Sequence, residues 1–304
     1  MQATKTMETC NICGEGRAVY RRPYSGETFC RRCFIEAFEK RVMRTVSAYK
    51  MFRRNDRIAV AVSGGKDSLA LLQVLAKIER RYPDASLFAV TVDEGIEGYR
   101  TESVANAVAV AERLDIPIHV VTFEELYGVN LMEIMERPEI SRSGLLACSV
   151  CGPLRRKAIN YAARRLGATV VATAHTLDDI VQTYMMKVFR GELGYTDVGL
   201  RSDGPAIPRV SPFRLSPEKE VVLYAYFTGI PFQTHACPNA HMAMRNPIKE
   251  FLAAYEERHP GALYAALRSF ERVKTANNKS LCYCESCGEP TSRRRCRPCE
   301  ILIG

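Results

Sequence analysis

The chain has 304 residues, 47% of them hydrophobic and 25% charged, which is the composition of a globular protein with enough chain for about two domains. It has no run of about 18 apolar residues, which excludes a membrane-spanning helix. Its first ten residues lack the apolar stretch of a secretory signal, so we expect a cytoplasmic protein. The 43 basic residues outnumber the 34 acidic ones, and the excess is concentrated between residues 17 and 57. This concentration suggests a nucleic-acid partner, with a solvated helix face as the alternative.

Twelve cysteines in a chain without a secretion signal favour metal or redox chemistry over disulfides. Eight of them form two terminal sets, each made of two Cys-x-x-Cys pairs: Cys10, Cys13, Cys30 and Cys33, then Cys284, Cys287, Cys296 and Cys299. Four thiolates are the tetrahedral set that zinc prefers. Each module is too short to fold on its own core, so the metal would supply the folding energy. We expect two structural zinc sites without a catalytic role.

The elements between these modules follow an alternating pattern. Residues 31–53 combine apolar positions at helical spacing with many basic residues, which predicts an amphipathic helix. Predicted strands then cover 58–62, 87–92, 116–121 and 168–173, and predicted helices cover 68–80, 101–114, 154–166 and 178–189. Further helices are expected from 216, over 246–257 and over 262–274. This alternation predicts an α/β fold, a parallel sheet with helices on both faces.

A glycine-containing loop follows the first predicted strand and leads into a helix. It comprises Ser63, Gly64, Gly65, Lys66, Asp67 and Ser68. Glycines let a backbone approach a phosphate, and the N–H groups at a helix start face an anion. The carboxylate of Asp67 makes sense there if it holds Mg2+ or orients a nucleophile. The loop differs in spacing from that of kinases and GTPases, and it resembles the PP-loop of the N-type ATP pyrophosphatases, which cleave ATP between the α and β phosphates.

Three further cysteines lie in the predicted catalytic domain. Cys148 and Cys151 form a Cys-x-x-Cys pair with no second pair nearby, and Cys237 stands alone. Three thiolates can hold a [4Fe-4S] cluster and leave one iron open for sulfide. The alternatives are a nucleophilic thiolate that forms a persulfide or disulfide intermediate, and inert structural thiols. The pattern favours the cluster.

Together these motifs resemble the TtcA/TtuA family of tRNA 2-thiolation enzymes, most closely its zinc-flanked TtuA and wobble-uridine (Ctu/Ncs-type) branch. The shared features are the PP-loop, Cys-x-x-Cys-Gly at 148–152, Ala-His-x-Leu-Asp-Asp at 174–179, Cys-Pro-Asn-Ala at 237–240 and both terminal modules. The resemblance covers nearly the whole chain. It implies an adenylating, pyrophosphate-releasing tRNA sulfurtransferase, which activates the C2 oxygen of a uridine and replaces it with sulfur.

The resemblance also implies which residues form the site. Catalytic roles fall to Cys148, Cys151, Cys237, Asp67, Arg155 and Asp179, with the three cysteines holding the cluster. The nucleotide site comprises loop residues 63–68 with Ala61, Val92, Arg155, Ala174, His175 and Asp179. Arg155 would hold the α-phosphate, and Asp67 or Asp179 would hold the metal or a proton. The implied cofactors are ATP, Mg2+, two Zn2+ and a [4Fe-4S] cluster.

The implied partners are tRNA and a sulfur donor, which is either the thiocarboxylate of a ubiquitin-like sulfur carrier protein or free sulfide. A homodimer is also implied. We expect tRNA to be held by the basic helix and by the arginines of the second module, which are Arg293, Arg294, Arg295 and Arg297.

Three alternatives remain open at this point. Another PP-loop ligase or amidotransferase would not need the three central cysteines. The same thiolation could proceed through cysteine persulfide chemistry without a cluster. A zinc-ribbon RNA-binding adaptor would use the nucleotide fold only as a scaffold.

We expect five segments: a zinc module at 1–36, a basic linker helix at 37–55, the PP-loop catalytic domain at 56–258, a helical linker at 259–281 and a zinc ribbon at 282–304.

Overall fold

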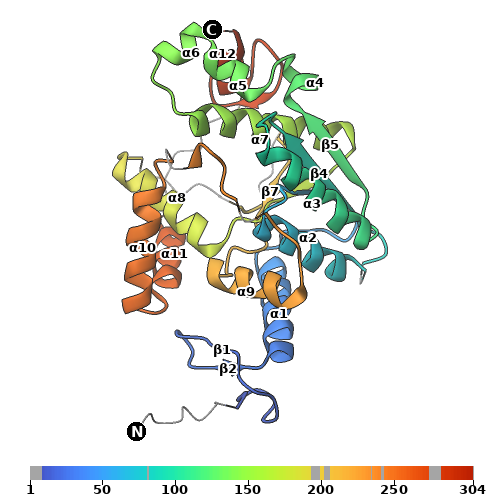
Figure 1. Cartoon of the computed structure of the whole chain (residues 1–304), viewed down its shortest axis with the longest axis vertical. Coiled ribbons are helices and arrows are strands. Elements are labelled where there is room, and N and C mark those ends of the chain that lie inside the picture. The colour runs from blue at the N-terminus through green and yellow to red at the C-terminus, as the bar shows by residue number, and fades with distance from the viewer. Residues whose placement is uncertain are drawn as a thin grey trace.

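A central parallel sheet organises the molecule (Figure 1). The computed structural model describes residues 9–80, 82–192, 199–201, 206–233, 235–240, 243–273 and 282–303. The sheet has the order β5-β4-β3-β6-β7, and all neighbouring strands are parallel. The strands are β3 (Arg57–Ala61), β4 (Ser86–Asp93), β5 (Ile118–Thr122), β6 (Val170–Ala172) and β7 (Arg209–Val210). The predicted α/β fold class is confirmed.

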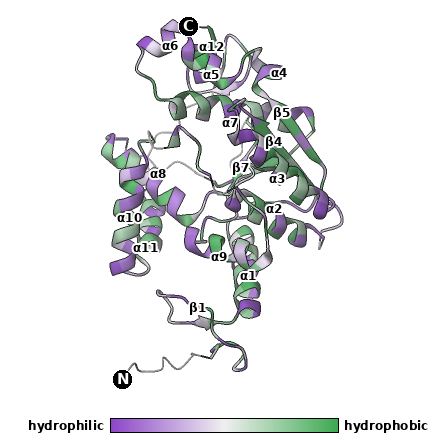
Figure 2. Ribbon diagram, viewed as in Figure 1, coloured by the Kyte–Doolittle hydropathy of each residue, from purple (hydrophilic) through white to green (hydrophobic). Residues whose placement is uncertain are grey.

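Side chains along each strand alternate between two hydrophobic cores. On β3, Ile58 and Val60 face one core, whereas Ala59 faces the other. On β4, Ala89 faces the first core and Phe88 the second. Because successive residues of a strand point to opposite faces, continuous apolar runs are needed where helices cover both faces. Figure 2 shows strands that are mainly hydrophobic, surrounded by helices that carry both kinds of residue.

Helices from distant parts of the chain cover the two faces. One core contains residues of α1 (Arg31–Ala48), α2 (Lys66–Glu79), α3 (Tyr99–Arg113) and α9 (Glu218–Thr228). The other contains residues of α4 (Phe123–Tyr127), α5 (Leu131–Glu136), α6 (Pro138–Arg142), α7 (Ala147–Arg165) and α12 (Arg297–Ile303). A separate cluster joins α8 (Leu177–Phe189), α10 (Asn246–Arg258) and α11 (Ala262–Arg272), which lie together beside the sheet (Figure 1).

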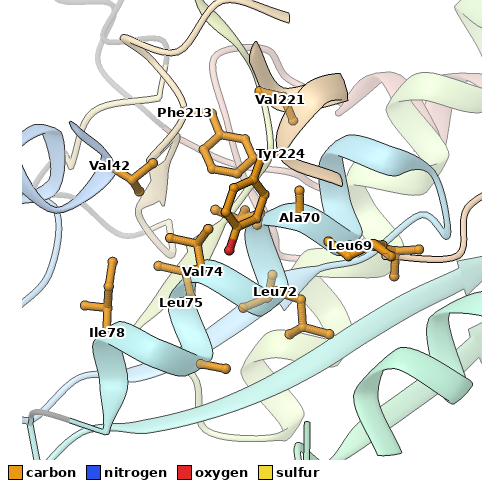
Figure 3. Packing of buried hydrophobic residues seen from close by; sticks show 14 of the residues in the cluster. Val42, Leu69, Ala70, Leu72, Val74, Leu75, Ile78, Phe213, Val221 and Tyr224 are labelled. Carbon is orange, nitrogen blue, oxygen red and sulfur yellow. The ribbon is translucent and has the colours of Figure 1, made fainter. Parts of the chain in front are cut away.

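The first core is centred on aromatic side chains. The Phe38 ring of α1 stacks on the Tyr224 ring of α9 with 4.6 Å between centroids, and it meets the Phe213 ring edge-on at 5.5 Å. Figure 3 shows Tyr224 and Phe213 lying over the apolar side chains of α2, among them Val74 and Leu75. Stacked and edge-on rings add about 0.5–1.5 kcal/mol per pair to the energy of burial. This core therefore fixes the long N-terminal helix α1 against α2 and α9.

The two cysteine modules lie at opposite ends of the molecule (Figure 1). The N-terminal module contains the short hairpin of β1 (Tyr20–Arg21) and β2 (Thr28–Phe29), and the C-terminal module contains that of β8 (Cys282–Tyr283) and β9 (Pro290–Thr291). The second module packs through α12 on α7. None of the helices in the described ranges is long and apolar enough to cross a membrane.

Several element boundaries differ from the predicted ones. The helix predicted over 31–53 ends at Ala48, because Lys50 adopts a left-handed backbone with φ 48° and reverses the chain. The helix predicted from 154 begins at Ala147, since α7 accommodates Pro153 within its first turns. The pattern did not predict β7 or the short helices between 123 and 142. The predicted end of the helix over 262–274 lies outside the described residues.

Candidate active site

A cavity of about 380 Å³ lies at the carboxyl ends of β3 and β6. These two strands are neighbours, but the chain continues from β3 to β4 on one side and from β6 to β7 on the other. In open parallel sheets, ligands bind at such a switch point, because the loops after the two strands diverge and leave a crevice. The cavity is lined by the loop after β3, by the segments after β4 and β6, by α7 and by the loop that carries Cys237.

The PP-loop turns sharply from β3 into α2. The hydroxyls of Ser63 and Ser68 lie 3.1 Å apart, and the Ser68 hydroxyl accepts the Ser63 N–H at 3.0 Å. Gly64 has φ +81°, and a Cβ atom there would lie 1.9 Å from the carbonyl oxygen of Ser103 on α3. Glycine at this position is thus required by the neighbouring helix as well as by its backbone conformation.

Charged groups surround the start of α2. The Lys66 ammonium lies 3.0 Å from Asp67 Oδ2 and 3.1 Å from Glu218 Oε1. Burial raises the pKa of Asp67 despite Lys66, and the two carboxylates raise the pKa of Lys66 against its own burial. Within the described residues, Asp67 Oδ1 is buried and has no hydrogen-bond partner. A buried carboxylate oxygen without a partner fits a hard cation such as Mg2+, which prefers oxygen ligands.

The structure brings the three central cysteines to this same cavity. Cys148 and Cys151 lie in the first turns of α7, and Cys237 lies in the loop that follows residue 234. The Cys148 thiol donates to the carbonyl of Asn239 at 3.7 Å, which joins the start of α7 to the Cys237 loop. Burial raises the pKa of Cys151. The three thiols are thus present as a set of soft ligands beside the PP-loop, which is the donor chemistry that iron–sulfur clusters use.

A single buried carboxylate connects the PP-loop to the cysteine helix. Glu94, which follows β4 and is 1% exposed, lies 2.7 Å from the Nε of Arg100 and 2.5 Å from the Nε of Arg155. Arg100 donates to the carbonyl of Ser63 at 2.9 Å and to that of Val92. Arg155 also donates to Cys151 Sγ at 3.1 Å. Arg155 therefore contacts a carboxylate and a thiol in this structure.

His175 follows β6 on the far wall of the cavity. Its Nδ1 lies 2.9 Å from the Thr173 hydroxyl. Withdrawal from water lowers the pKa of His175, and nearby Arg245 and Arg209 act in the same direction against Asp179. The ring is therefore neutral at pH 7 and can donate or accept one proton at the cavity surface. Asp179 accepts the backbone N–H of Thr176 at 3.1 Å and pairs with Arg245 at 3.0 Å.

Most of the residues expected in the site line the cavity. These are Ala61, Ser63, Asp67, Ser68, Val92, Cys148, Cys151, Arg155, Ala174, His175 and Cys237. Four expected residues are not among the cavity-lining side chains: Gly64, Gly65, Lys66 and Asp179. The sequence reasoning missed Glu94, Arg100, Arg156, Arg209 and Asn239. Glu94 comes two residues after the strand predicted over 87–92, so its place near a carboxyl end was a usable signal. The start of β7 at Arg209 gave none.

The terminal cysteine sets have the geometry of single-metal sites. The four sulfurs of each set lie within 4.8 Å of one another. Cys13 and Cys30 Sγ are 3.9 Å apart, and Cys287 and Cys296 Sγ are 3.7 Å apart. Zn–S bonds of about 2.3 Å in a tetrahedron place sulfurs about 3.8 Å apart. In the described part of the chain, the three central cysteines do not form such a tight group. A multi-iron cluster suits wider spacing, because each cysteine binds a different iron.

Comparison with known proteins agrees with this geometry. A family model described as a PP-loop domain matches residues 36–254. A second, described as the N-terminal LIM domain of 2-thiouridine synthetase TtuA, matches residues 9–35. The sheet order, the loop after β3 and the first match define the chain as a PP-loop protein.

Relatives and a solved structure narrow the class. The chain is 37% identical to cytoplasmic tRNA 2-thiolation protein 1 of Bos taurus and 35% identical to that of Chlamydomonas reinhardtii. Each alignment covers 97% of this chain, with 87% of the Bos taurus protein and 84% of the Chlamydomonas reinhardtii protein. The U34-tRNA thiolase NcsA from Methanococcus maripaludis, solved with its [4Fe-4S] cluster, superposes with a TM-score of 0.84 at 29% identity. That match covers 98% of this chain and 96% of the other. The chain belongs to the tRNA 2-thiolation family of PP-loop proteins.

Proposed function

We propose that this chain catalyses ATP-dependent 2-thiolation of a uridine in tRNA. The observation that supports this proposal most directly is that Cys148, Cys151 and Cys237 share one cavity with Ser63 and Asp67 of the PP-loop. The C2 oxygen of uridine is a poor leaving group, so ATP must activate it before sulfur can replace it. The loop that binds ATP and the group that supplies sulfur must therefore reach the same base. The C2 oxygen attacks the α-phosphate of ATP and releases pyrophosphate. A sulfur nucleophile then attacks C2 and displaces AMP.

The loop supplies the ATP site in this proposal. The N–H groups at the start of α2 and the hydroxyls of Ser63 and Ser68 would face the phosphates, and Ala61 and Val92 at the strand ends would meet adenine. Asp67 Oδ1 would hold Mg2+, which neutralises charge on the triphosphate when bound. Lys66 adds a cation next to the same carboxylate. His175, neutral at pH 7, would donate a hydrogen bond to phosphate from the opposite wall.

We propose that the three central cysteines hold a [4Fe-4S] cluster. When bound, such a cluster supplies an iron site that can carry sulfide. Arg155 donates to Cys151 Sγ while Glu94 holds its guanidinium, and from this position it would hold the α-phosphate of ATP. The persulfide route is the competing chemistry, and it needs a sulfur donor but no iron.

The remaining parts of the proposal concern metals and partners. The terminal sulfur groups would each hold one Zn2+, which supports folding of two modules with small cores. The sulfur donor is either a ubiquitin-like carrier with a thiocarboxylate or free sulfide, and the protein acts as a homodimer in the cytoplasm. Uridine 34 is the proposed position, since NcsA is a U34-tRNA thiolase. Catalytic roles for Asp67, Asp179 and Arg155 belong to this proposal.

The decisive experiment compares cysteine variants purified without oxygen. Wild type is expected to contain about four irons per chain, to bind ATP and to form 2-thiouridine in tRNA with ATP, Mg2+ and sulfide. Cys148→Ser and Cys237→Ser are expected to lose at least 100-fold in thiolation and most of the iron, while ATP affinity stays within about threefold. Mass spectrometry of RNase fragments identifies the modified uridine.

Cys282→Ser serves as the matched control. Cys282 is exposed and lies outside both four-sulfur groups, and within the described ranges its thiol donates to the carbonyls of Thr291 and Arg293, both at 3.3 Å. We expect this variant to behave as wild type. Full thiolation by Cys148→Ser or Cys237→Ser would overturn the proposed function of these cysteines. Thiolation without iron in wild type would replace the cluster with persulfide chemistry.

A further inference from the structure

Two arginines lie where the active-site cavity meets a second depression. Arg156 lies on α7, directly after Arg155, and Arg209 is the first residue of β7. Both line the cavity that contains the PP-loop and the central cysteines. Both also line a groove of about 330 Å³ between α7 and the C-terminal module, together with Lys157, Asn160 and Arg297. Among the residues that the structure describes, these two line both spaces.

The Arg209 guanidinium is held in a fixed orientation. Its Nε and Nη2 donate to Asn160 Oδ1 at 3.2 and 2.9 Å, and Nη2 also donates to the carbonyl of Arg156 at 2.8 Å. Over the described ranges, Nη1 has no partner, and neither does the guanidinium of Arg156. A guanidinium carries five N–H donors. The Arg209 guanidinium is held by protein contacts at Nε and Nη2, so the N–H groups of Nη1 can donate to an acceptor without further ordering of the side chain.

The pair also carries positive charge that protein carboxylates do not compensate. The other two arginines of the cavity, Arg100 and Arg155, share Glu94. In the part of the chain that the structure describes, no carboxylate lies within ion-pair distance of Arg156 or Arg209. Burial and the neighbouring Arg156 lower the pKa of Arg209 to about 10. Burial and the neighbouring Arg155 lower the pKa of Arg156. Such a like-charged pair is relieved by an anion placed between its members.

The groove continues this positive surface away from the cavity. Lys157 lines the groove and donates to Cys299 Sγ of the second module at 3.4 Å. Of the described residues that line the groove, the acidic one is Glu289, and it is paired with Arg164 at 2.6 Å. A flexible anionic chain could thus run from the C-terminal module to the two arginines and then into the cavity.

We propose that Arg156 and Arg209 bind the backbone phosphate next to the nucleotide that enters the active site. The ligand class is a phosphodiester of a polynucleotide. Arginine suits this task, because its planar fork matches phosphate oxygens and fixes the position of the RNA without reading its sequence. The inference rests on the proposed function for the identity of the polynucleotide. Phosphates of ATP are the second possible source, but they are expected at the PP-loop, whereas this pair also faces the groove outside the cavity.

The test uses the metal-loaded, full-length protein with Arg156→Gln, Arg209→Gln and the double variant. We expect each single variant to weaken tRNA binding about tenfold at 100 mM salt and to reduce the slope of log Kd against log salt by about one. The affinity for ATP is expected to stay within about twofold. In turnover assays the KM for tRNA should rise, with kcat changed less. Arg156→Lys and Arg209→Lys keep the charge and should restore part of the affinity.

Arg165→Gln is the matched control. Arg165 lies on the same helix, and its guanidinium contacts the hydroxyl of Tyr161 at 2.9 Å outside both spaces. This variant should bind tRNA as wild type does. Unchanged tRNA affinity in the double variant, with or without a loss of ATP affinity, would overturn the inference. Loss of tRNA binding by a protein whose wild type forms no 2-thiouridine would support the RNA site and reject the proposed function alone.

Discussion

Gly64 is constrained by its backbone and by the helix beside it. Its φ of +81° is a conformation that L side chains rarely adopt, and an added Cβ would meet Ser103 O at 1.9 Å. We expect Gly64→Ala to destabilise the protein by at least about 2 kcal/mol, because the PP-loop must move away from α3. Urea unfolding measures this change, and ATP affinity should fall with it.

Gly65→Ala is the control for this prediction. Gly65 has φ −85°, and its added Cβ would meet the Ser63 hydroxyl oxygen at an ordinary 3.6 Å. Its stability should differ from that of wild type by less than about 0.5 kcal/mol. Equal stabilities of the two variants would show that Ser103 does not constrain the loop. The two adjacent glycines thus differ in role. Gly64 is required by the close approach of α3, whereas Gly65 has room for a side chain and leaves its backbone to face a ligand.

At the scale of elements, Asp178 connects α8 to the start of α9. Its Oδ2 accepts the backbone N–H of Glu218 at 2.7 Å. Burial raises the pKa of Asp178 to about 6, and the charges of Glu218 and Asp179 act in the same direction. An aspartate in the unfolded chain titrates near 3.9. The native state therefore binds this proton more tightly, so ionisation of Asp178 lowers stability as the pH rises from about 4 to about 6.

Asp178→Asn removes this charge and keeps an oxygen that can accept the Glu218 N–H. We expect the variant to be more stable than wild type by about 1–3 kcal/mol at pH 8. The difference should fall to about half at pH 5 and disappear below about pH 4. Urea unfolding at several pH values measures it. A difference that does not depend on pH, or a loss of stability at pH 8, would contradict the assignment.

The helices and central strands could be predicted because their patterns are long. The apolar runs around Val60 and Val90 reach both cores, and a run of this kind indicates a strand buried on two faces. β7 has two residues, and pairing with β6 defines it, so no local pattern marks it. The first turns of α7 contain Gly152 and Pro153, which are weak helix formers, and tertiary packing overrides their preference.

Some residues of the candidate site could be predicted from sequence motifs, and others could not. Ser63, Asp67 and the three cysteines belong to motifs with fixed spacing, and the structure places all five in one cavity. Arg156 and Arg209 could not be found from spacing, because they meet only through the folding of α7 against β7. For the basic residues of the first helix, the sequence pattern predicted an RNA contact but could not show which of them pair with carboxylates of the protein. Arg41, expected to contact RNA, pairs with the buried Glu220 at 2.8 Å.

At the scale of the whole molecule, one carboxylate attaches the N-terminal module to the catalytic domain. Glu220 on α9 is fully buried. It accepts hydrogen bonds from Arg22 at 3.1 Å, from the Tyr24 hydroxyl at 2.7 Å and from Arg41 at 2.8 Å. Removing this charge leaves two arginines without their shared counterion, which typically costs about 3–5 kcal/mol.

We therefore expect Glu220→Gln to release the N-terminal module. Hydrogen exchange should rise in residues 9–35 and in the first turns of α1, while the PP-loop and α7 stay protected. Glu27→Gln is the control, because Glu27 pairs with the same Arg22 at 2.7 Å but is 40% exposed. The control should cost less than about 1 kcal/mol. Equal protection of the module in both variants would show that the aromatic contacts of α1 hold it alone.

The two terminal modules stand at opposite ends of the long axis, so they cannot both contact one short stretch of RNA (Figure 1). The arginines of the second module are also partly neutralised: Arg294 pairs with Glu285, and Arg297 pairs with Glu300. The groove beside Arg156 and Arg209 is the basic surface that leads into the cavity.

Glu94 links the two sides of the candidate active site, the PP-loop and the helix that carries Cys151. One carboxylate oxygen of Glu94 pairs with Arg100, which donates to the carbonyl of Ser63 in the PP-loop. The other oxygen pairs with Arg155, which donates to Cys151 Sγ. Because the same carboxylate pairs with both arginines, the proposed ATP-binding loop and the start of α7 that carries Cys151 are linked through three side chains. In the proposed reaction, Glu94 would hold the loop that activates the base and the helix that delivers sulfur at a fixed separation, and Glu94→Asp would uncouple these two steps.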